Sequence, residues 1–117
     1  MVPAGVQLLA QLAAPAERLV AAIFPHIRIC CFEVSEQVAD TLAAAADGGA
    51  SALRREPGEK PHVDLSRLLC LQLAAAGLAA SRVELLPGCT RCEPERFFSY
   101  RRDGQVSGRH LAVIAAG

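Results

Sequence analysis

The sequence of 117 residues contains no tryptophan, and its aromatic residues are only four phenylalanines and one tyrosine. Large core side chains are therefore scarce, even though 52% of the chain is hydrophobic, much of it alanine. A chain of this length supports one domain with a modest core, and a second domain is not expected. We therefore treat residues 1–117 as a single unit.

The sequence also lacks an excess of charge of either sign, with 12 lysines and arginines against 12 aspartates and glutamates. No overall field would attract nucleic acid or an anionic membrane. No uninterrupted apolar run approaches the roughly 20 residues that span a bilayer. The opening segment has no basic start and is interrupted by Pro15 and Glu17, which predicts no export signal. We expect a cytoplasmic protein that binds neither nucleic acid nor membranes.

Cysteine is present in an odd number, five, so the cysteines cannot all pair within one chain. Without an export signal, we interpret them as reduced thiols. Cys30 and Cys31 are adjacent and do not readily bridge, because the peptide between them would be strained. Cys89 and Cys92 form a single Cys-x-x-Cys pair, whereas a structural zinc site needs four ligands. Pro94 and the aromatic run after it do not resemble the thioredoxin redox motif.

The chain has only three histidines, and none lies at finger-like spacing from this cysteine pair. The sequence therefore predicts no metal site in this chain. His62 lies in a polar segment before a helix and is expected to be solvated. His26 ends an apolar strand, where open α/β sheets place their sites, so it is a candidate substrate-binding residue. The alternative for His26 is a hydrogen-bonded structural histidine. Cys70, on a helical ladder, is expected to be a small core residue.

Apolar periodicity predicts alternating helices and strands. Residues 47–63 are polar and broken by glycine and proline, which predicts a mobile surface loop. Val38, Leu42 and Ala45 are expected to form the inner face of the helix that follows the Ser35 cap. The expected elements are a helix over 4–14, a strand over 18–24, a helix over 36–46, a helix from Asp64 to Gly77, and strands over 81–88 and 110–115. This order favours an α+β fold with α/β/α-like layers, in which helices cover a mixed sheet.

The segment from Cys89 to Arg109 concentrates the rings and the arginines. It contains Arg91, Arg96, Arg101, Arg102 and Arg109, together with Phe97, Phe98 and Tyr100. An apolar pair beside an arginine pair suggests rings anchored in a core and guanidinium groups directed at an anion or an acidic partner. The alternative is a loop whose rings fill the core and whose arginines are solvated or ion-paired. The sequence contains no glycine-rich phosphate loop and no Ser/His/Asp arrangement.

Three segments in order resemble the multicopper polyphenol oxidase, or laccase-domain, family, which includes the YfiH-like peptidoglycan editing factor and purine nucleoside phosphorylases. The resemblance is carried by Cys89-Thr90-x-Cys92, by Phe97 to Asp103 with Ser107 to Arg109, and by the upstream segments 17–38 and 61–78. Phe24 and Ser35 depart from the family, which usually has glycine at the first position and often at the second. Glycine permits backbone angles that other residues resist.

The resemblance implies a YfiH-like fold of which this chain is the C-terminal half, truncated at its N-terminus. It implies phosphorolysis of adenosine or inosine, with adenosine deamination also reported in the family and phenol oxidation in older descriptions. It places Arg101, Arg102 and Arg109 near the nucleoside or phosphate. To these we add His26 and Cys89 as candidate substrate-binding residues, and we assign no catalytic residue.

The family's zinc or copper would be held by two histidines and a cysteine of the N-terminal half, so no cofactor is expected in this chain. We therefore expect the chain alone to be inactive. One alternative is a non-catalytic half-domain that acts as a binding module. Another is a chain that pairs with a polypeptide carrying the other half, or that self-associates to cover an exposed sheet edge.

Overall fold

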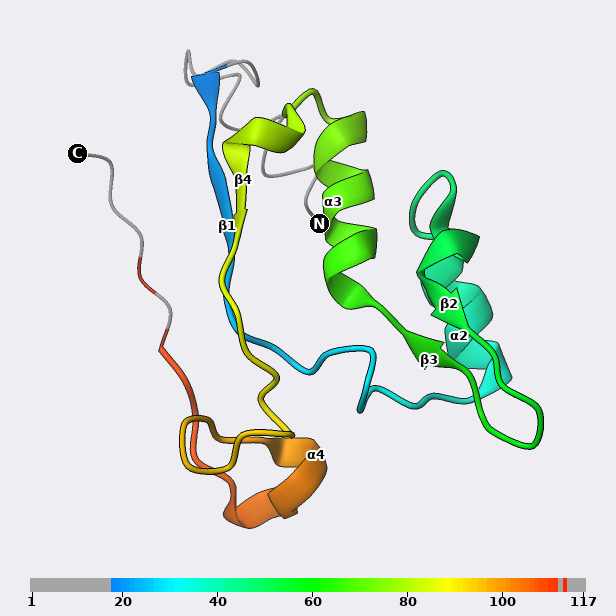
Figure 1. Cartoon of the computed structure of the whole chain (residues 1–117), viewed down its shortest axis with the longest axis vertical. Helices are drawn as coiled ribbons and strands as arrows, with labels where there is room; N and C mark the ends of the chain where they lie inside the picture. The colour runs from blue at the N-terminus through cyan, green and yellow to red at the C-terminus, as the bar shows by residue number, and fades with distance from the viewer. Residues whose placement is uncertain (1–17, 112, 114–117) are drawn as a thin grey trace.

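The computed structural model describes residues 18–111 and 113, and these form a mixed α+β structure (Figure 1). The described residues contain two separate two-stranded sheets, β1–β4 and β2–β3, where the sequence predicts one mixed sheet. The helix expected over 4–14 lies outside the described residues. The elements are β1 (Ala21–Ile23), α2 (Glu36–Ala43), η2 (Gly49–Ala52), β2 (Leu53–Arg54), β3 (His62–Val63), α3 (Leu65–Ala75), η3 (Ala80–Arg82), β4 (Val83–Leu85), α4 (Tyr100–Asp103) and η4 (Gly104–Val106).

Strands β1 and β4 run parallel, with Ala21 opposite Val83 and Ile23 opposite Leu85. Both lie within the predicted strands 18–24 and 81–88 but are shorter. The pairing resumes further along as a bridge between His26 and Cys89. Since parallel strands end at the same edge of a sheet, the turns that follow β1 and β4 lie together. Figure 1 shows the segment after β4 continuing to α4, whereas the segment after β1 crosses towards α2.

Helix α2 begins where the sequence predicts, because the Ser35 hydroxyl accepts a hydrogen bond from the Val38 N–H at 3.3 Å. Ser35 has an ordinary φ of −69°, so its departure from glycine causes no strain. The predicted inner face is confirmed at Leu42, which packs against the core, and is wrong at Val38 and Ala45. Ala39 is fully buried and Val38 is 43% exposed, while Ala45 lies beyond the end of the helix. Apolar residues lie on two neighbouring faces of this helix. The core packs against the face that contains Ala39.

The prediction of a mobile surface loop over 47–63 is also wrong in part. Residues 49–52 form η2, and Leu53 pairs with Val63 in an antiparallel β2–β3 hairpin. Ala52, Pro61 and Val63 are almost completely buried, and His62, expected to be solvated, is only 9% exposed. The hairpin forms because Gly58 turns the chain at a φ of 79° and returns it to the core. Residues 47, 48, 50, 51 and 54–60 keep the expected exposure.

The main core lies where α2, η2, β3 and α3 meet. Its buried members are Val34, Ala39, Ala52, Val63 and Leu68, with Phe32, Leu42, Ala46, Leu53 and Leu65 packed against them. The buried members are all small or aliphatic, as the scarcity of aromatic residues predicts. Among the described helices, none has the length and apolar character needed to cross a membrane.

Helix α3 confirms its predicted cap and stop. The Asp64 carboxylate accepts hydrogen bonds from the Arg67 N–H at 3.1 Å and the Ser66 hydroxyl at 2.6 Å. Gly77 follows the helix with a φ of 104°, the left-handed conformation that glycine adopts most easily. At the other end of the chain, His110, Leu111 and Val113 belong to no strand, and the rest of the predicted strand 110–115 lies outside the described residues.

Removing the Asp64 cap should destabilise the chain modestly. We expect Asp64→Ala to lower the free energy of unfolding by about 1 kcal/mol, because two donors at the helix start lose their acceptor. Asp47→Ala is the matched control, since Asp47 is exposed and caps no helix. Urea denaturation of both variants measures the effect, and equal losses would contradict the assigned cap.

Candidate functional site

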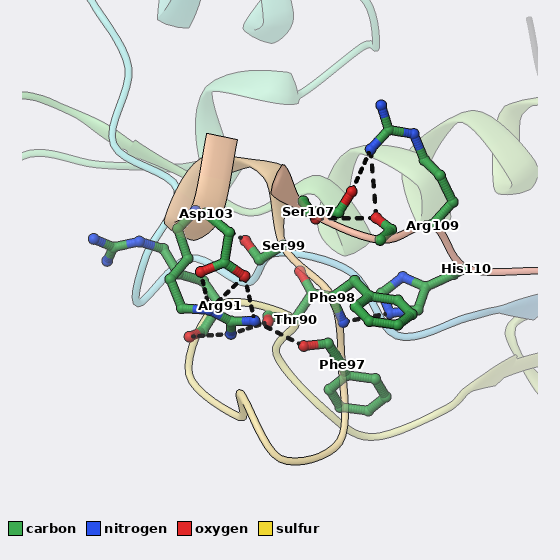
Figure 2. A network of polar contacts seen from close by, with 11 residues as sticks. Thr90, Arg91, Phe97, Phe98, Ser99, Asp103, Ser107, Arg109 and His110 are labelled. Atoms are coloured by element: carbon green, nitrogen blue, oxygen red, sulfur yellow. Dashed lines mark hydrogen bonds and ion pairs between the residues drawn. The ribbon is translucent and has the colours of Figure 1, made fainter. Parts of the chain in front are cut away.

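Residues 93–110, which follow the Cys-x-x-Cys pair, form a compact arch around α4 (Figure 2). The buried Ser99 caps α4, accepting a hydrogen bond from the Arg102 N–H at 3.3 Å. Helix α4 has a single turn, and Gly104 ends it at a φ of 63°. The arch carries the three arginines of the predicted site, and each has a different environment.

Arg102 is enclosed by main-chain carbonyls. Its Nη1 donates to the carbonyls of Thr90 at 3.1 Å and Arg91 at 3.3 Å, and its Nη2 donates to that of Phe97 at 2.9 Å. Its Nε and Nη2 also meet the Asp103 carboxylate, at 3.1 and 2.9 Å. Every nitrogen of the guanidinium therefore has a partner within the chain. This arrangement ties the Cys-x-x-Cys turn to the start of α4, and substrate contact by Arg102 stays a prediction.

Arg101 is exposed and lines a pocket. Its Nη1 donates to the Glu33 carbonyl at 2.8 Å, and its Cζ lies 5.4 Å from the centre of the Phe32 ring. The remaining guanidinium nitrogens have no hydrogen-bond partner among the described residues. The pocket has a volume of about 260 Å³ and is lined by Ile27, Phe32, Thr90, Ser99, Tyr100 and Arg101. Of the three arginines, Arg101 is the one that lines this pocket.

Arg109 lies beyond η4 and is exposed. Its Nη1 makes only two long hydrogen bonds, of 3.4 Å each, to the carbonyls of Ser107 and Gly108. Its Cζ is 6.0 Å from the centre of the Tyr100 ring, and Tyr100 lines the Arg101 pocket. Weak contacts thus hold Arg109 near the rim of that pocket. An anionic ligand would form stronger hydrogen bonds with its guanidinium than these carbonyls do.

The aromatic residues of the arch are less buried than the sequence suggests. Phe98 is 52% exposed and Tyr100 is 60% exposed, while Phe97 is half-buried. Figure 2 shows the His110 ring beside Phe98, and the ring centres lie 5.5 Å apart. The Phe98 N–H donates to His110 Nε2 at 2.8 Å. These rings therefore pack against each other within the arch and not in the core.

His26 lies apart from the arginines. It lines a different cavity, of about 560 Å³, with residues of β1 and with Leu65, Leu69 and Leu73 of α3. The two cavities share no lining residue. His26 Nδ1 is 2.8 Å from the Phe24 carbonyl, and its buried Nε2 has no hydrogen-bond partner among the described residues. The fold does not bring His26 to the arginine pocket.

Cys89 is buried and joins three other cysteines. The sulfur atoms of Cys30, Cys31, Cys89 and Cys92 all lie within 4.8 Å of one another. Reasoning from the sequence sought histidines to complete the Cys89–Cys92 pair and missed the adjacent cysteines. The available signal was positional, because each cysteine pair follows one strand of a parallel sheet.

The zinc or copper implied by the resemblance would need two histidines and a cysteine. In the part of the chain that the structure describes, the four thiols are the only group of three or more potential metal ligands. No histidine belongs to it. These residues therefore do not provide the implied donor set.

Comparison with known proteins places this geometry in context. Residues 1–117 match the model of the family described as multi-copper polyphenol oxidoreductase laccase. The purine nucleoside phosphorylase YlmD of Geobacillus stearothermophilus is 40% identical over 95 residues, which are 80% of this chain and 34% of that protein. A purine nucleoside phosphorylase of Bacteroides thetaiotaomicron is 37% identical over 99 residues, covering 84% of this chain and 37% of that protein.

Two further similarities extend the comparison. The adenosine deaminase RL5 of an unknown prokaryotic organism is 36% identical over 102 residues, covering 86% of this chain and 39% of that protein. The crystal structure of YlmD from Geobacillus stearothermophilus superposes with a TM-score of 0.80 at 31% identity, over 91% of this chain and 40% of that one. The chain thus spans between a third and two fifths of the length of these relatives.

Proposed function

Because the chain belongs to the multi-copper polyphenol oxidoreductase laccase family, we propose that it forms part of the substrate site of a purine nucleoside phosphorylase-type enzyme. The substrates would be adenosine or inosine together with inorganic phosphate. The observation that carries the proposal is the Arg101 pocket, which lies in a segment similar to relatives named purine nucleoside phosphorylase. Adenosine deamination is a second candidate activity, favoured by the relative named adenosine deaminase.

The chemistry of phosphorolysis explains why guanidinium groups suit this pocket. A phosphate oxygen forms a bond to C1′ of the ribose while the bond from C1′ to the purine nitrogen breaks. The electron pair of the broken bond goes to the base, which takes up a proton. Phosphate enters as an anion, and an arginine fork binds its oxygens through charge-assisted hydrogen bonds. In this proposal Arg101 binds phosphate within the pocket and Arg109 binds it at the rim.

The pocket is too small for the whole substrate pair. Its volume of about 260 Å³ is below the roughly 300–1,000 Å³ of pockets that enclose drug-sized ligands. We propose that it receives the phosphate or the ribose, and that a second polypeptide segment or another copy of this chain supplies the opposite wall. That wall would also carry the family's zinc or copper ion. On this proposal, β1–β4 is one part of a larger layered mixed sheet, in a cytoplasmic protein whose thiols stay reduced.

The proposal can be tested in a chimaera. The segment of Geobacillus YlmD that matches this chain would be replaced by residues 1–117, and phosphate-dependent release of base from inosine would be measured. We expect activity in the chimaera and none from the isolated chain. In the chimaera, Arg101→Ala should lower kcat/KM by about tenfold to a hundredfold, the loss of one charged hydrogen-bonding contact of roughly 1.5–3 kcal/mol.

Arg55→Ala is the matched control, because Arg55 is also an exposed arginine and pairs with Glu36 at 2.8 Å, on the β2–β3 hairpin. Its activity should equal that of the unmodified chimaera. A folded chimaera that is inactive, or an Arg101→Ala variant of undiminished kcat/KM, would contradict the proposal. Either result would favour the alternative of a non-catalytic half-domain that acts as a binding module.

A further inference from the structure

The four cysteines are brought together by the parallel pairing of β1 and β4. Cys30 and Cys31 lie in a turn beyond β1, where the Cys31 N–H donates to the Arg28 carbonyl at 3.0 Å. Cys89 and Cys92 lie in a turn beyond β4. The bridge between His26 and Cys89 fixes the two turns side by side. The cluster therefore joins cysteines 58 to 62 positions apart in sequence.

The distances within the cluster suit one metal ion. The sulfur of Cys30 lies 3.6 Å from that of Cys31, 3.7 Å from that of Cys89 and 3.4 Å from that of Cys92. The sulfurs of Cys31 and Cys92 are 3.1 Å apart, and no pair exceeds 4.8 Å. A tetrahedral zinc ion with Zn–S bonds of about 2.3 Å requires sulfur–sulfur edges of about 3.8 Å. Small shifts of exposed side chains would produce that tetrahedron.

Hydrogen bonds within the chain close the Cys-x-x-Cys turn. The Cys89 N–H donates to the Glu93 carboxylate at 3.0 Å, and the Glu93 N–H donates back to the Cys89 carbonyl at 3.2 Å. The Arg28 N–H points at the Cys89 sulfur from the other turn, at 3.4 Å. Backbone amides directed at a sulfur stabilise its thiolate, which is the form that binds metals.

We propose that Cys30, Cys31, Cys89 and Cys92 bind one Zn²⁺ ion as a four-thiolate structural site. Four sulfur donors in tetrahedral array favour zinc over magnesium or calcium, and they leave no open position for a reacting water. The ion fastens the turn after β1 to the turn after β4. It thereby fixes the carbonyls of Thr90 and Arg91 that hold Arg102, at the base of the arch. This site differs in ligands and role from the histidine-containing metal site that the resemblance implies.

The metal content of the full 117-residue chain tests the proposal. The chain would be produced with zinc, copper and iron available and purified under reducing conditions without chelator. Native mass spectrometry and elemental analysis should find one zinc per chain. Replacement of zinc by Co²⁺ should give the thiolate-to-cobalt absorption and the intense visible bands of a tetrahedral sulfur site. A strong chelator should lower the melting temperature.

Cys92→Ser should lose the zinc, the cobalt bands and the response to chelator, and the exposure of Cys92 makes this change mild for packing. Cys70→Ser is the matched control, since Cys70 is the one cysteine of the chain outside the cluster, and it should keep all three. Reduced, folded wild-type chain without zinc or cobalt bands would overturn the proposal. So would iron or copper in place of zinc, or disulfides between the two turns in protein whose thiols were trapped at lysis. These readouts need no nucleoside, so they succeed or fail independently of the proposed phosphorylase activity.

Discussion

Replacing Arg102 by alanine is expected to lower the free energy of unfolding by about 2–4 kcal/mol, the cost of leaving several acceptors of a charged donor unpaired. The carbonyls of Thr90, Arg91 and Phe97 and the Asp103 carboxylate all accept from this one guanidinium. Figure 2 shows Thr90, Arg91, Phe97 and Asp103 in one network of polar contacts. Thr90 is only 8% exposed, so water replaces its partner poorly. Chemical denaturation of the two proteins measures the loss.

Two variants separate this role from general effects of charge. Arg102→Lys keeps the charge, but an ammonium group cannot span carbonyls on two sides, so it should recover less than half of the lost stability. Arg101→Ala removes the neighbouring arginine, which makes one main-chain hydrogen bond and is exposed. It should cost less than about 1 kcal/mol. Equal losses for Arg101→Ala and Arg102→Ala would show that Arg102 has no special structural role.

Gly88→Ala is expected to be about as damaging, for a steric reason. Gly88 has a φ of 130°, and a Cβ there would lie 2.7 and 2.8 Å from two ring atoms of Phe97. The backbone angle alone costs roughly 1–2 kcal/mol for a residue with a side chain. Overpacking against the half-buried ring adds roughly 1–3 kcal/mol. Because Gly88 precedes Cys89, the same change should also disturb the cysteine cluster.

Gly58→Ala provides the matched control, since Gly58 has a positive φ of 79° but nothing lies within 4 Å of its Cβ position. It should show the cost of the backbone angle alone. The double variant Gly88→Ala/Phe97→Leu should recover part of the excess loss, because leucine is smaller than the ring. Thermal denaturation of the variants gives the comparison. Similar melting temperatures for Gly58→Ala and Gly88→Ala would rule out the ring contact as a cause.

Both predictions concern one architectural unit, in which the cysteine turns, Arg102 and α4 support each other. Arg102 of α4 donates to the carbonyls of the Cys-x-x-Cys turn. Cys92 of that turn contacts Cys30 and Cys31 beyond β1. The Arg101 pocket is lined by Phe32, which follows Cys31, and by Tyr100 of α4. A change in the cysteine cluster should therefore propagate to the pocket.

Local features whose causes lie within a few residues could be predicted from the sequence. Hydroxyl and carboxylate caps at Ser35 and Asp64, the glycine stop at Gly77 and the positions of the two parallel strands are confirmed. Family membership was also readable from short motifs, because each motif is contiguous in the chain. The concentration of arginines between Cys89 and Arg109 likewise needed no structure to be found.

Which of these residues lie close together in space depends on the tertiary structure. Parallel pairing of β1 with β4 unites cysteines some 60 positions apart, and it leaves His26 in a cavity separate from the arginine pocket. Similarly, Ala39 is buried in the core while Val38 is exposed, and His62 is buried. Local propensities act over only one or two turns of chain. Contacts between distant segments depend on strand pairing and on the packing that pairing allows.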